Sequence, residues 1–284
     1  MSLANLRVLT LESRKAKDME TLILREEGIP IVAPSVQERP LDDNTAAFDF
    51  VERLEAGEFD MTICMTGVGL AFLRDIVVTK MPVERLAAAM NRTTILSRGP
   101  KPVGILRAMG VPVHVMIPEP NTWREIVEGV AQRPERRIAM QQYGRPNPEL
   151  DAALEALGAT VAQFPLYRWD LPSDLEPLRS AVRQLAAEEV DVVLFTSSIQ
   201  LDHLFLVAQE LGLEAQVRST LQRKVVNASI GPVMTDAMRA AGIPVDIIPN
   251  HPKMWALVKA AAVEAEAALS KKRAASTPLS GAST

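Results

Sequence analysis

The chain carries one structural unit twice, and this duplication narrows the folds that are open to it. Three pairs of segments are each separated by 132 residues: Gly99-Pro100 and Gly231-Pro232, Gly110-Val-Pro-Val113 and Gly242-Ile-Pro-Val245, and Trp123 and Trp255. Two earlier pairs, Phe59–Gly67 with Val190–Ser198 and Leu6–Pro34 with Arg137–Pro165, match at 131 residues. A repeat of this length predicts two related halves.

Short apolar runs alternate with helical patterns along both halves. Most of these runs are unbroken, as is typical of parallel strands that are covered on both faces. Asn147–Gly158 is the clearest helix, with Asn147 as N-cap, Pro148 at the first helical position and Gly158 as the stop. We place strands at 5–10, 30–34, 60–65, 92–97, 113–117, 136–141, 160–164, 190–196, 224–229 and 244–248. The alternation predicts an α/β protein with parallel sheets.

Composition excludes several classes of partner. The 284 residues suit two domains of ordinary size, and a net charge of −4 with 4% aromatic residues argues against nucleic-acid binding. The single cysteine, Cys64, lies in an apolar run, so we expect a buried thiol. No apolar stretch reaches the roughly 18 residues of a membrane span, and the N-terminus lacks the pattern of a signal peptide. We expect a cytoplasmic protein with a disordered tail over 270–284, whose Lys271–Arg273 is a solubilising end.

Familiar catalytic signatures are missing from the sequence. Thr66-Gly-Val-Gly69 follows a predicted strand but is too short for a dinucleotide fingerprint. Ser197 and Ser198 are not in a nucleophile elbow, and N-capping of a helix at Ile199–Leu211 is an equally good interpretation. The histidines His114, His203 and His251 lack metal-ligand spacing, and we expect ordinary surface or edge residues there. These histidines therefore give no indication of a metal site.

Turns that follow the predicted strands are rich in backbone N–H groups and small hydroxyls. In α/β sheets, ligands bind at this edge, and helix N-termini there attract anions. The turns are Thr10–Arg14, Thr66–Gly69, Ser97–Lys101, Gln142–Pro146, Thr196–Ser198, Ser229–Thr235 and Asn250–Lys253. Arg14, Arg98, Lys101 and Lys253 add positive charge nearby, although each alone is also compatible with a solvated surface charge. Together they favour a ligand with several carboxylates or phosphates.

Three segments resemble the uroporphyrinogen-III synthase family: Asp191–Ser198, Ser229–Pro249, and the tyrosine of Phe164-Pro-Leu-Tyr-Arg-Trp169. The resemblance covers about residues 5–269. It implies two doubly wound α/β domains joined by a two-stranded β-linker, with one domain formed by 1–36 plus 168–269 and the other by 38–166. It also implies a hinge at the linker, and we expect a monomer.

The resemblance implies a lyase of tetrapyrrole biosynthesis, on the route to haem, sirohaem and cobalamin. Such an enzyme closes hydroxymethylbilane, a linear tetrapyrrole, to uroporphyrinogen III and inverts the last pyrrole ring without a metal or cofactor. The eight carboxylates of this substrate suit turns that are rich in N–H donors. Because the bilane also closes by itself to the wrong isomer, the enzyme chiefly controls orientation, with a proton donor helping hydroxide to leave.

Site residues follow from the resemblance by position. Tyr167 matches the tyrosine near the leaving hydroxyl and is the implied proton donor; a packing role in the linker is the alternative. Substrate contacts are implied or expected at Ser197, Ser198, Thr66, Arg98, Gly99, Lys101, Gly231, Pro232, Met234, Thr235 and Arg14.

The sequence departs from the family pattern at several of these positions. Met234 and Pro102 stand where the family usually has threonine, and Thr66-Gly-Val-Gly-Leu-Ala71 replaces Thr-Ser-x-Arg-Ala-Val. A non-catalytic relative that binds a tetrapyrrole or another polyanion as a sensor is therefore the alternative. A periplasmic-type binding protein also fits a duplicated α/β chain, but the missing signal peptide argues against it.

Overall fold

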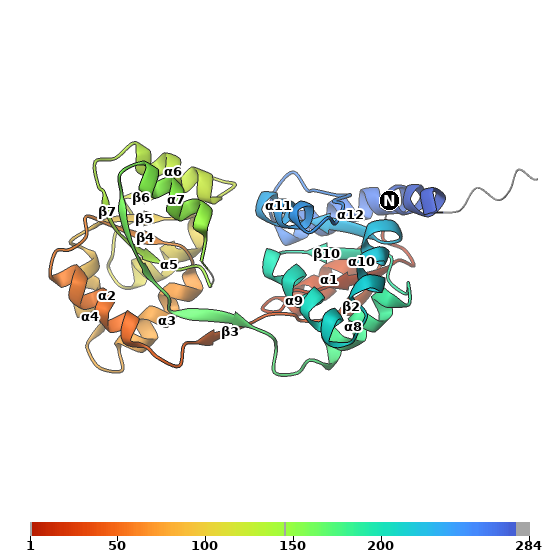
Figure 1. The fold of residues 1–284 in the computed structure, drawn as a ribbon, viewed down its shortest axis with the longest axis horizontal. Helices are drawn as coiled ribbons and strands as arrows, with labels where there is room; N and C mark the ends of the chain where they lie inside the picture. The colour runs from red at the N-terminus through yellow and green to blue at the C-terminus, as the bar shows by residue number, and fades with distance from the viewer. Residues whose placement is uncertain (1, 145, 277–284) are drawn as a thin grey trace, which may run out of the picture. The chain divides into compact units, whose positions relative to one another are not determined.

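The computed structural model of the chain describes residues 2–144 and 146–276, which separate into two compact units (Figure 1). Unit 1 combines the described residues up to Gln37, in red, with those from Asp170 onward, from green to blue. Unit 2 is Glu38–Trp169, from orange to green. The chain thus leaves unit 1, builds unit 2 without interruption, and returns.

Unit 1 contains a four-stranded parallel sheet in the order β11-β10-β1-β2. Its strands are β1 (Arg7–Thr10), β2 (Ile29–Val32), β10 (Val192–Phe195) and β11 (Val226–Ser229). Alternate side chains enter two separate cores, because successive residues of a strand face opposite sides. One core is shared with α1 (Ala16–Arg25) and α12 (Met254–Ser276); the other is shared with α8 (Glu176–Ala186), α9 (Ser198–Glu210), α10 (Glu214–Arg223) and α11 (Pro232–Ala240).

Unit 2 contains a five-stranded parallel sheet in the order β6-β5-β4-β7-β8. Its strands are β4 (Met61–Cys64), β5 (Thr94–Ser97), β6 (Val115–Met116), β7 (Arg137–Gln141) and β8 (Thr160–Phe164). One face packs on α2 (Thr45–Glu55), α3 (Gly67–Val77), α4 (Val83–Met90) and α5 (Pro100–Ala108), the other on α6 (Trp123–Ala131) and α7 (Pro148–Ala156). The unbroken apolar runs of the sequence are explained by this double coverage.

A two-stranded sheet of β3 (Gln37–Pro40) and β9 (Tyr167–Asp170) joins the units. The predicted fold class, two doubly wound parallel sheets with a two-stranded linker, is therefore confirmed. The predicted helix over Asn147–Gly158 is also present: α7 is capped by the Asn147 side chain, which accepts a hydrogen bond from Leu150 N–H at 3.1 Å. Within the described part of the chain, no helix has the length and apolar character needed to cross a membrane.

Each sheet has one place where the chain order reverses. In unit 2 the chain adds strands outward from β4 on one side and from β7 on the other. In unit 1 the same reversal lies between β10 and β1. Crevices at the carboxyl ends of such neighbouring strands are where doubly wound folds bind ligands.

An arginine–aspartate pair marks the opposite edge of both sheets. Asp191 precedes β10 and accepts hydrogen bonds from the N–H and Nε of Arg7, at 2.8 and 3.0 Å. Asp60 precedes β4 and accepts them from Arg137, at 3.3 Å from its N–H and 3.0 Å from its Nε. Since Val8 pairs with Val192 as Ile138 pairs with Met61, Arg7 corresponds to Arg137. The alignment of Leu6 with Arg137 is thus wrong by one residue.

Three further expectations from the sequence are wrong. The predicted strand at 244–248 is only an isolated bridge between Ile247 and Ala228. The predicted disordered tail begins too early, because α12 continues to Ser276; residues 277–284 lie outside the described residues. Lys272 and Arg273 are not a free solubilising end: Lys272 forms a salt bridge with Asp246 at 2.6 Å, and Arg273 contacts Asp191.

Candidate functional site

The carboxyl ends of β4 and β7, where unit 2 reverses its strand order, bring Thr66 and Tyr167 together. Thr66 is the N-cap of α3, and its hydroxyl accepts a hydrogen bond from Gly69 N–H at 2.9 Å. The same hydroxyl lies 3.3 Å from the phenol oxygen of Tyr167, which comes from β9. A threonine and a tyrosine that are 101 residues apart thus share one hydrogen bond at a helix N-terminus.

Tyr167 is held among aromatic side chains. Its ring stacks on Phe72 of α3 with centroids 5.6 Å apart and makes an edge contact with Trp169 at 6.4 Å. Only 3% of the residue is exposed. This enclosure fixes the direction of the phenol and keeps it in a weakly polar environment, where a hydrogen bond is stronger than in water.

Gln141, the last residue of β7, ties that strand to the start of α3. Its Oε1 accepts a hydrogen bond from Thr66 N–H at 2.9 Å, and its Nε2 donates to the Gln142 carbonyl. The residue is fully buried. A Cβ added to Gly69 would lie 2.0 Å from Gln141 Nε2, and one added to Gly67 would lie 2.7 Å from the Lys101 carbonyl. Both glycines of Thr66-Gly-Val-Gly69 are therefore explained by close packing.

The turn after β5 lies beside the end of β4, since Arg98 N–H donates to the Cys64 carbonyl at 3.1 Å. Arg98 Nε donates to the Asn121 carbonyl at 2.9 Å, and the guanidinium lies 4.4 Å from the centre of the Tyr143 ring. Gly99 has φ of 145° and is the N-cap of α5. Asn121 fills the space beside Gly99, so a side chain there would be both strained and crowded.

Lys101 lies exposed in the first turn of α5, whereas Pro102 is buried. The predicted anion-binding charge of this turn therefore comes from a half-buried arginine and an exposed lysine. Because Pro102 is buried, its ring offers little surface to a ligand.

In unit 1, the corresponding edge lies between the ends of β1 and β10. A series of hydrogen bonds connects the side chains there. Thr196 Oγ1 donates to the Glu12 carboxylate at 2.6 Å and accepts from Gln200 Nε2 at 2.8 Å. Gln200 Oε1 accepts from Thr196 N–H at 2.8 Å and from Ser197 N–H at 3.2 Å. Ser197 is the N-cap of α9, as the capping interpretation required.

Neighbouring predicted residues differ in exposure. Ser198, the first residue of α9, is buried, whereas Arg14 is exposed in the turn between β1 and α1. His203 is not a surface histidine, because only 7% of it is exposed and its Nδ1 lies 2.6 Å from the Ser35 carbonyl. This contact ties α9 to the segment that precedes β3.

The predicted contact residues in the turn after β11 differ in exposure. Gly231 is the N-cap of α11, Pro232 is exposed at its first position, and Ser229 Oγ donates to the Gly231 carbonyl at 3.1 Å. Met234 is 2% exposed and packs in the core, and the Thr235 hydroxyl is paired with Ser229 Oγ at 2.9 Å. The expectation that the Met234 and Thr235 side chains contact a substrate is therefore not supported by their positions.

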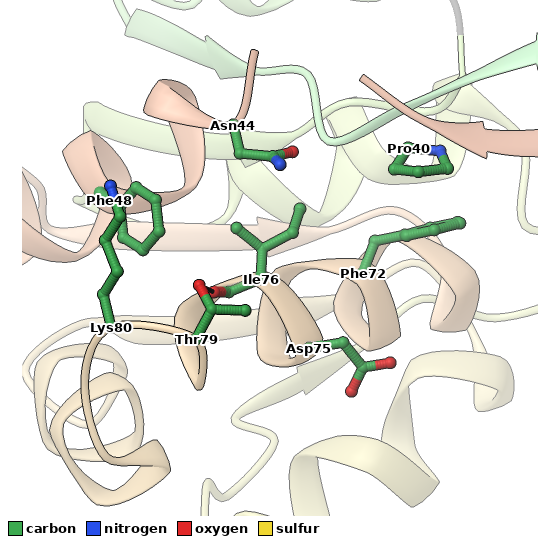
Figure 2. A pocket seen from close by; sticks show the side chains of 8 residues that line it. All are labelled: Pro40, Asn44, Phe48, Phe72, Asp75, Ile76, Thr79 and Lys80. Atoms are coloured by element: carbon green, nitrogen blue, oxygen red, sulfur yellow. Dashed lines mark hydrogen bonds between the residues drawn. The ribbon is translucent and has the colours of Figure 1, made fainter. Parts of the chain in front are cut away.

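A cavity of about 380 Å³ lies in unit 2 beside α3, and Phe72 forms part of its wall (Figure 2). Phe48, Phe72 and Ile76 line it with apolar surface, and Lys80 Nζ lies 4.3 Å from the centre of the Phe48 ring. Phe72 is thus shared between the cavity wall and the tyrosine stack. Within residues 2–144 and 146–276, no group of three His, Cys, Asp or Glu residues is placed to hold a metal ion.

Sequence reasoning missed three buried or partly buried polar residues: Gln141, Gln200 and Glu12. One signal was available, because Ser197-Ser-Ile-Gln200 matches the capping-box pattern of Ser followed three residues later by Gln. Gln141 has no such local pattern, since its partner Thr66 lies 75 residues away.

Comparison with known proteins shows similarity to one protein family. The model of the family described as "Uroporphyrinogen-III synthase HemD" matches residues 17–259. An "uncharacterized protein YjjA" of Bacillus subtilis (strain 168) is 27% identical over 248 residues, which are 87% of this chain and 91% of that protein. A "putative uroporphyrinogen-III synthase" of Methanothermobacter thermautotrophicus is 29% identical over 107 residues, 38% of this chain and 41% of that one.

Solved structures show the same fold. A mutant uroporphyrinogen III synthase of Thermus thermophilus has a TM-score of 0.70 at 24% identity, covering 94% of this chain and 99% of that one. The uroporphyrinogen-III synthetase of Helicobacter pylori 26695 has a TM-score of 0.53 at 14% identity, covering 89% and 97%. At these identities the likeness concerns the fold.

Proposed function

Because the chain belongs to the uroporphyrinogen-III synthase family, we propose that it converts hydroxymethylbilane into uroporphyrinogen III. In this proposal it is a lyase of tetrapyrrole biosynthesis that releases water, acts in the cytoplasm as a monomer, and uses neither a metal nor an organic cofactor. The last pyrrole ring is inverted through a spiro intermediate.

The proposed reaction needs little acid–base chemistry. The terminal hydroxyl leaves as water and takes up one proton, and the closed ring releases one proton, so the net change is loss of one water. The harder task is to hold the flexible chain so that the rearranging attack is faster than direct closure. Fixing reacting groups in one orientation is a large source of rate enhancement for such a step.

The observation that carries the proposal is the hydrogen bond between Tyr167 and Thr66 at the strand reversal of unit 2. The phenol is a proton donor of suitable chemistry, it lies 3.3 Å from the Thr66 hydroxyl, and aromatic packing fixes its orientation. Its place at a helix N-terminus favours the negative charge that remains after a proton is donated. We propose Tyr167 as the proton donor to the leaving hydroxyl.

The substrate's carboxylates are assigned to helix starts at the same edges. We propose that carboxylates lie near the starts of α5, α9 and α11, whose N-caps are Gly99, Ser197 and Gly231, because the N-terminus of a helix favours negative charge. Arg98 and Lys101 add charge at the first of these helices. We propose that Ser197, Ser198, Pro232 and Arg14 contribute through hydroxyl, backbone or charge, and that Met234 and Thr235 act only by packing.

A second candidate function is binding without catalysis, as a tetrapyrrole or polyanion sensor. The burial of Met234 and Pro102 favours it, because both stand where a hydroxyl is expected from the family pattern and neither presents a polar group. The two candidates differ in what they require of Tyr167: turnover needs its hydroxyl, whereas binding does not.

The test is to give the purified chain freshly prepared hydroxymethylbilane, oxidise the products and separate the isomers by chromatography. Excess type III over the spontaneous type I supports the synthase, and Tyr167→Phe should then lower its rate at least tenfold while the protein stays folded. Tyr143→Phe is the matched control because Tyr143 is the other of the chain's two tyrosines. Type I alone, at the rate without protein, would reject the synthase and leave binding as the function.

A further inference from the structure

The helices that begin at the two strand reversals, α3 and α9, meet the same capping requirement in different ways. The first N–H groups of a helix lack partners within it, and a capping box satisfies two of them from inside the helix. In α9, Gln200 stands three residues after the N-cap Ser197, and its Oε1 accepts from Ser197 N–H at 3.2 Å. In α3, the residue three after Thr66 is Gly69, which has no side chain to do this.

Gln141 provides the missing amide in α3 from the neighbouring strand. Its Oε1 accepts from Thr66 N–H at 2.9 Å, as Gln200 does for the N-cap of α9. The strand position that corresponds to Gln141 in unit 1 is Leu11, three residues after Val8 as Gln141 is three after Ile138, and Leu11 is fully buried and apolar. Each site therefore has one amide, supplied by the helix in unit 1 and by the strand in unit 2.

The two arrangements exclude each other. A Cβ at Gly69 would lie 2.0 Å from Gln141 Nε2 and 2.4 Å from its Cδ, far inside any real contact. The absence of a side chain at Gly69 thus leaves room for the Gln141 amide. The amide is fixed at both ends, since its Nε2 is used by the Gln142 carbonyl while its Oε1 holds Thr66.

We propose that Gln141 is a positioning residue of the reaction, an inference that rests on the proposed function. It holds the backbone of Thr66 against β7, so that the Thr66 hydroxyl stays within reach of both Gly69 N–H and the phenol of Tyr167. A capping amide on the helix itself would fix α3 only to its own first turn. The amide from β7 instead fixes the helix start to the sheet on which the proposed proton donor depends.

The experiment first removes the side-chain amide of Gln141 and then introduces an amide at position 69 of α3. Gln141→Leu keeps the volume but removes the acceptor, and we expect kcat for type III formation to fall at least tenfold with KM changed less than threefold. The double variant Gly69→Gln/Gln141→Leu copies the Leu11 and Gln200 pair of unit 1, and it should recover at least half of the lost activity. Gly69→Gln alone should be damaging because of the clash.

A spectroscopic signal reports Tyr167 without requiring activity. The chain has two tyrosines, so Tyr143→Phe leaves Tyr167 as the single site for 3-fluorotyrosine and gives one ¹⁹F resonance. Gln141→Leu in this background should shift that resonance, the double variant should bring it back, and exchange of the exposed Gln132 for leucine should leave it unchanged. Circular dichroism melting checks that each variant is folded.

The outcomes separate this inference from the proposed function. If the starting protein makes no type III isomer, the synthase is rejected, and the ¹⁹F resonance alone decides whether Gln141 positions Tyr167. If the protein is active, an unshifted resonance or an unchanged kcat in Gln141→Leu overturns the positioning role. A shifted resonance that the double variant fails to restore also overturns it, because the effect would then be general damage.

Discussion

The two arginine–aspartate pairs form a natural comparison between a buried and an exposed version of one interaction. The Asp191 side chain is 7% exposed and accepts from the Arg7 N–H, from the Arg7 guanidinium and from Arg273 of α12 at 2.7 Å. The Asp60 side chain is 35% exposed, and its salt bridge is with Arg137. We predict that Asp191→Ala destabilises its unit more than Asp60→Ala does.

The magnitude follows from burial and partner number. Losing a buried charged partner costs about 3–5 kcal/mol, but Arg7 and Arg273 retain access to water, so we expect about 3 kcal/mol for Asp191→Ala. An exposed pair is worth up to about 1 kcal/mol, which is our expectation for Asp60→Ala. At roughly 3 °C per kcal/mol, the melting temperatures of the affected units should fall by roughly 9 and 3 °C.

The pH dependence gives a second check. Burial alone would raise the pKa of the Asp191 carboxyl, but hydrogen bonds from Arg7 and the charges of Arg7 and Arg273 outweigh it, and the pKa lies below its usual value. A carboxyl with a lowered pKa stabilises the fold above its unfolded pKa, and this contribution is lost as the pH falls through the folded value. The difference between the wild type and Asp191→Ala should therefore shrink in acid.

Differential scanning calorimetry of the full chain, from pH 7 down to pH 3, measures both effects because it follows the unfolding of each unit. Equal losses of stability for the two variants, or a larger loss for Asp60→Ala, would refute the argument from burial. A difference between wild type and Asp191→Ala that grows in acid would refute the assignment of the charged partner.

Three further predictions concern single side chains in unit 2. Phe72→Ala should remove the stack on Tyr167, lower stability by about 2 kcal/mol and reduce type III formation, as thermal melting and the isomer assay would reveal; Phe72→Leu is the control. Burial raises the pKa of the Cys64 thiol to about 12, so it should resist iodoacetamide at pH 8 until the protein is unfolded, and fast labelling of folded protein would contradict this. Hydrogen bonding from Arg133 chiefly lowers the pKa of Glu135 to about 2, so the stability lost in Glu135→Gln should be constant above pH 5 and vanish towards pH 2 in urea titrations.

The fold was accessible from the sequence because local patterns and the repeat agreed. Strands covered on both faces leave unbroken apolar runs, and Asn147 with Pro148 marks a helix start by local chemistry alone. The linker could be placed from the family resemblance. The failures were residues whose environment is made by distant segments, such as His203, which meets Ser35 across 168 positions of sequence.

The candidate site was less accessible for the same reason. Thr66 and Tyr167 could be named from the resemblance, but their hydrogen bond depends on three separate segments. Gly69 looked like part of a failed nucleotide-binding fingerprint, whereas its small size is required by Gln141. Lys272 and Arg273 looked like a solvated tail because their acidic partners, Asp246 and Asp191, are not their neighbours in the sequence.

The interrupted path of unit 1 has a consequence for how the protein is made. Arg7 and Asp191 are 184 residues apart, and all of Glu38–Trp169 is synthesised between them. During translation, β1 and β2 therefore emerge from the ribosome long before β10, the neighbour that completes the middle of their sheet. Because domains fold as units when their residues become available, unit 2 should form first on the nascent chain. Until Val192–Phe195 has been synthesised, β1 carries an unpaired edge that molecular chaperones would be expected to recognise.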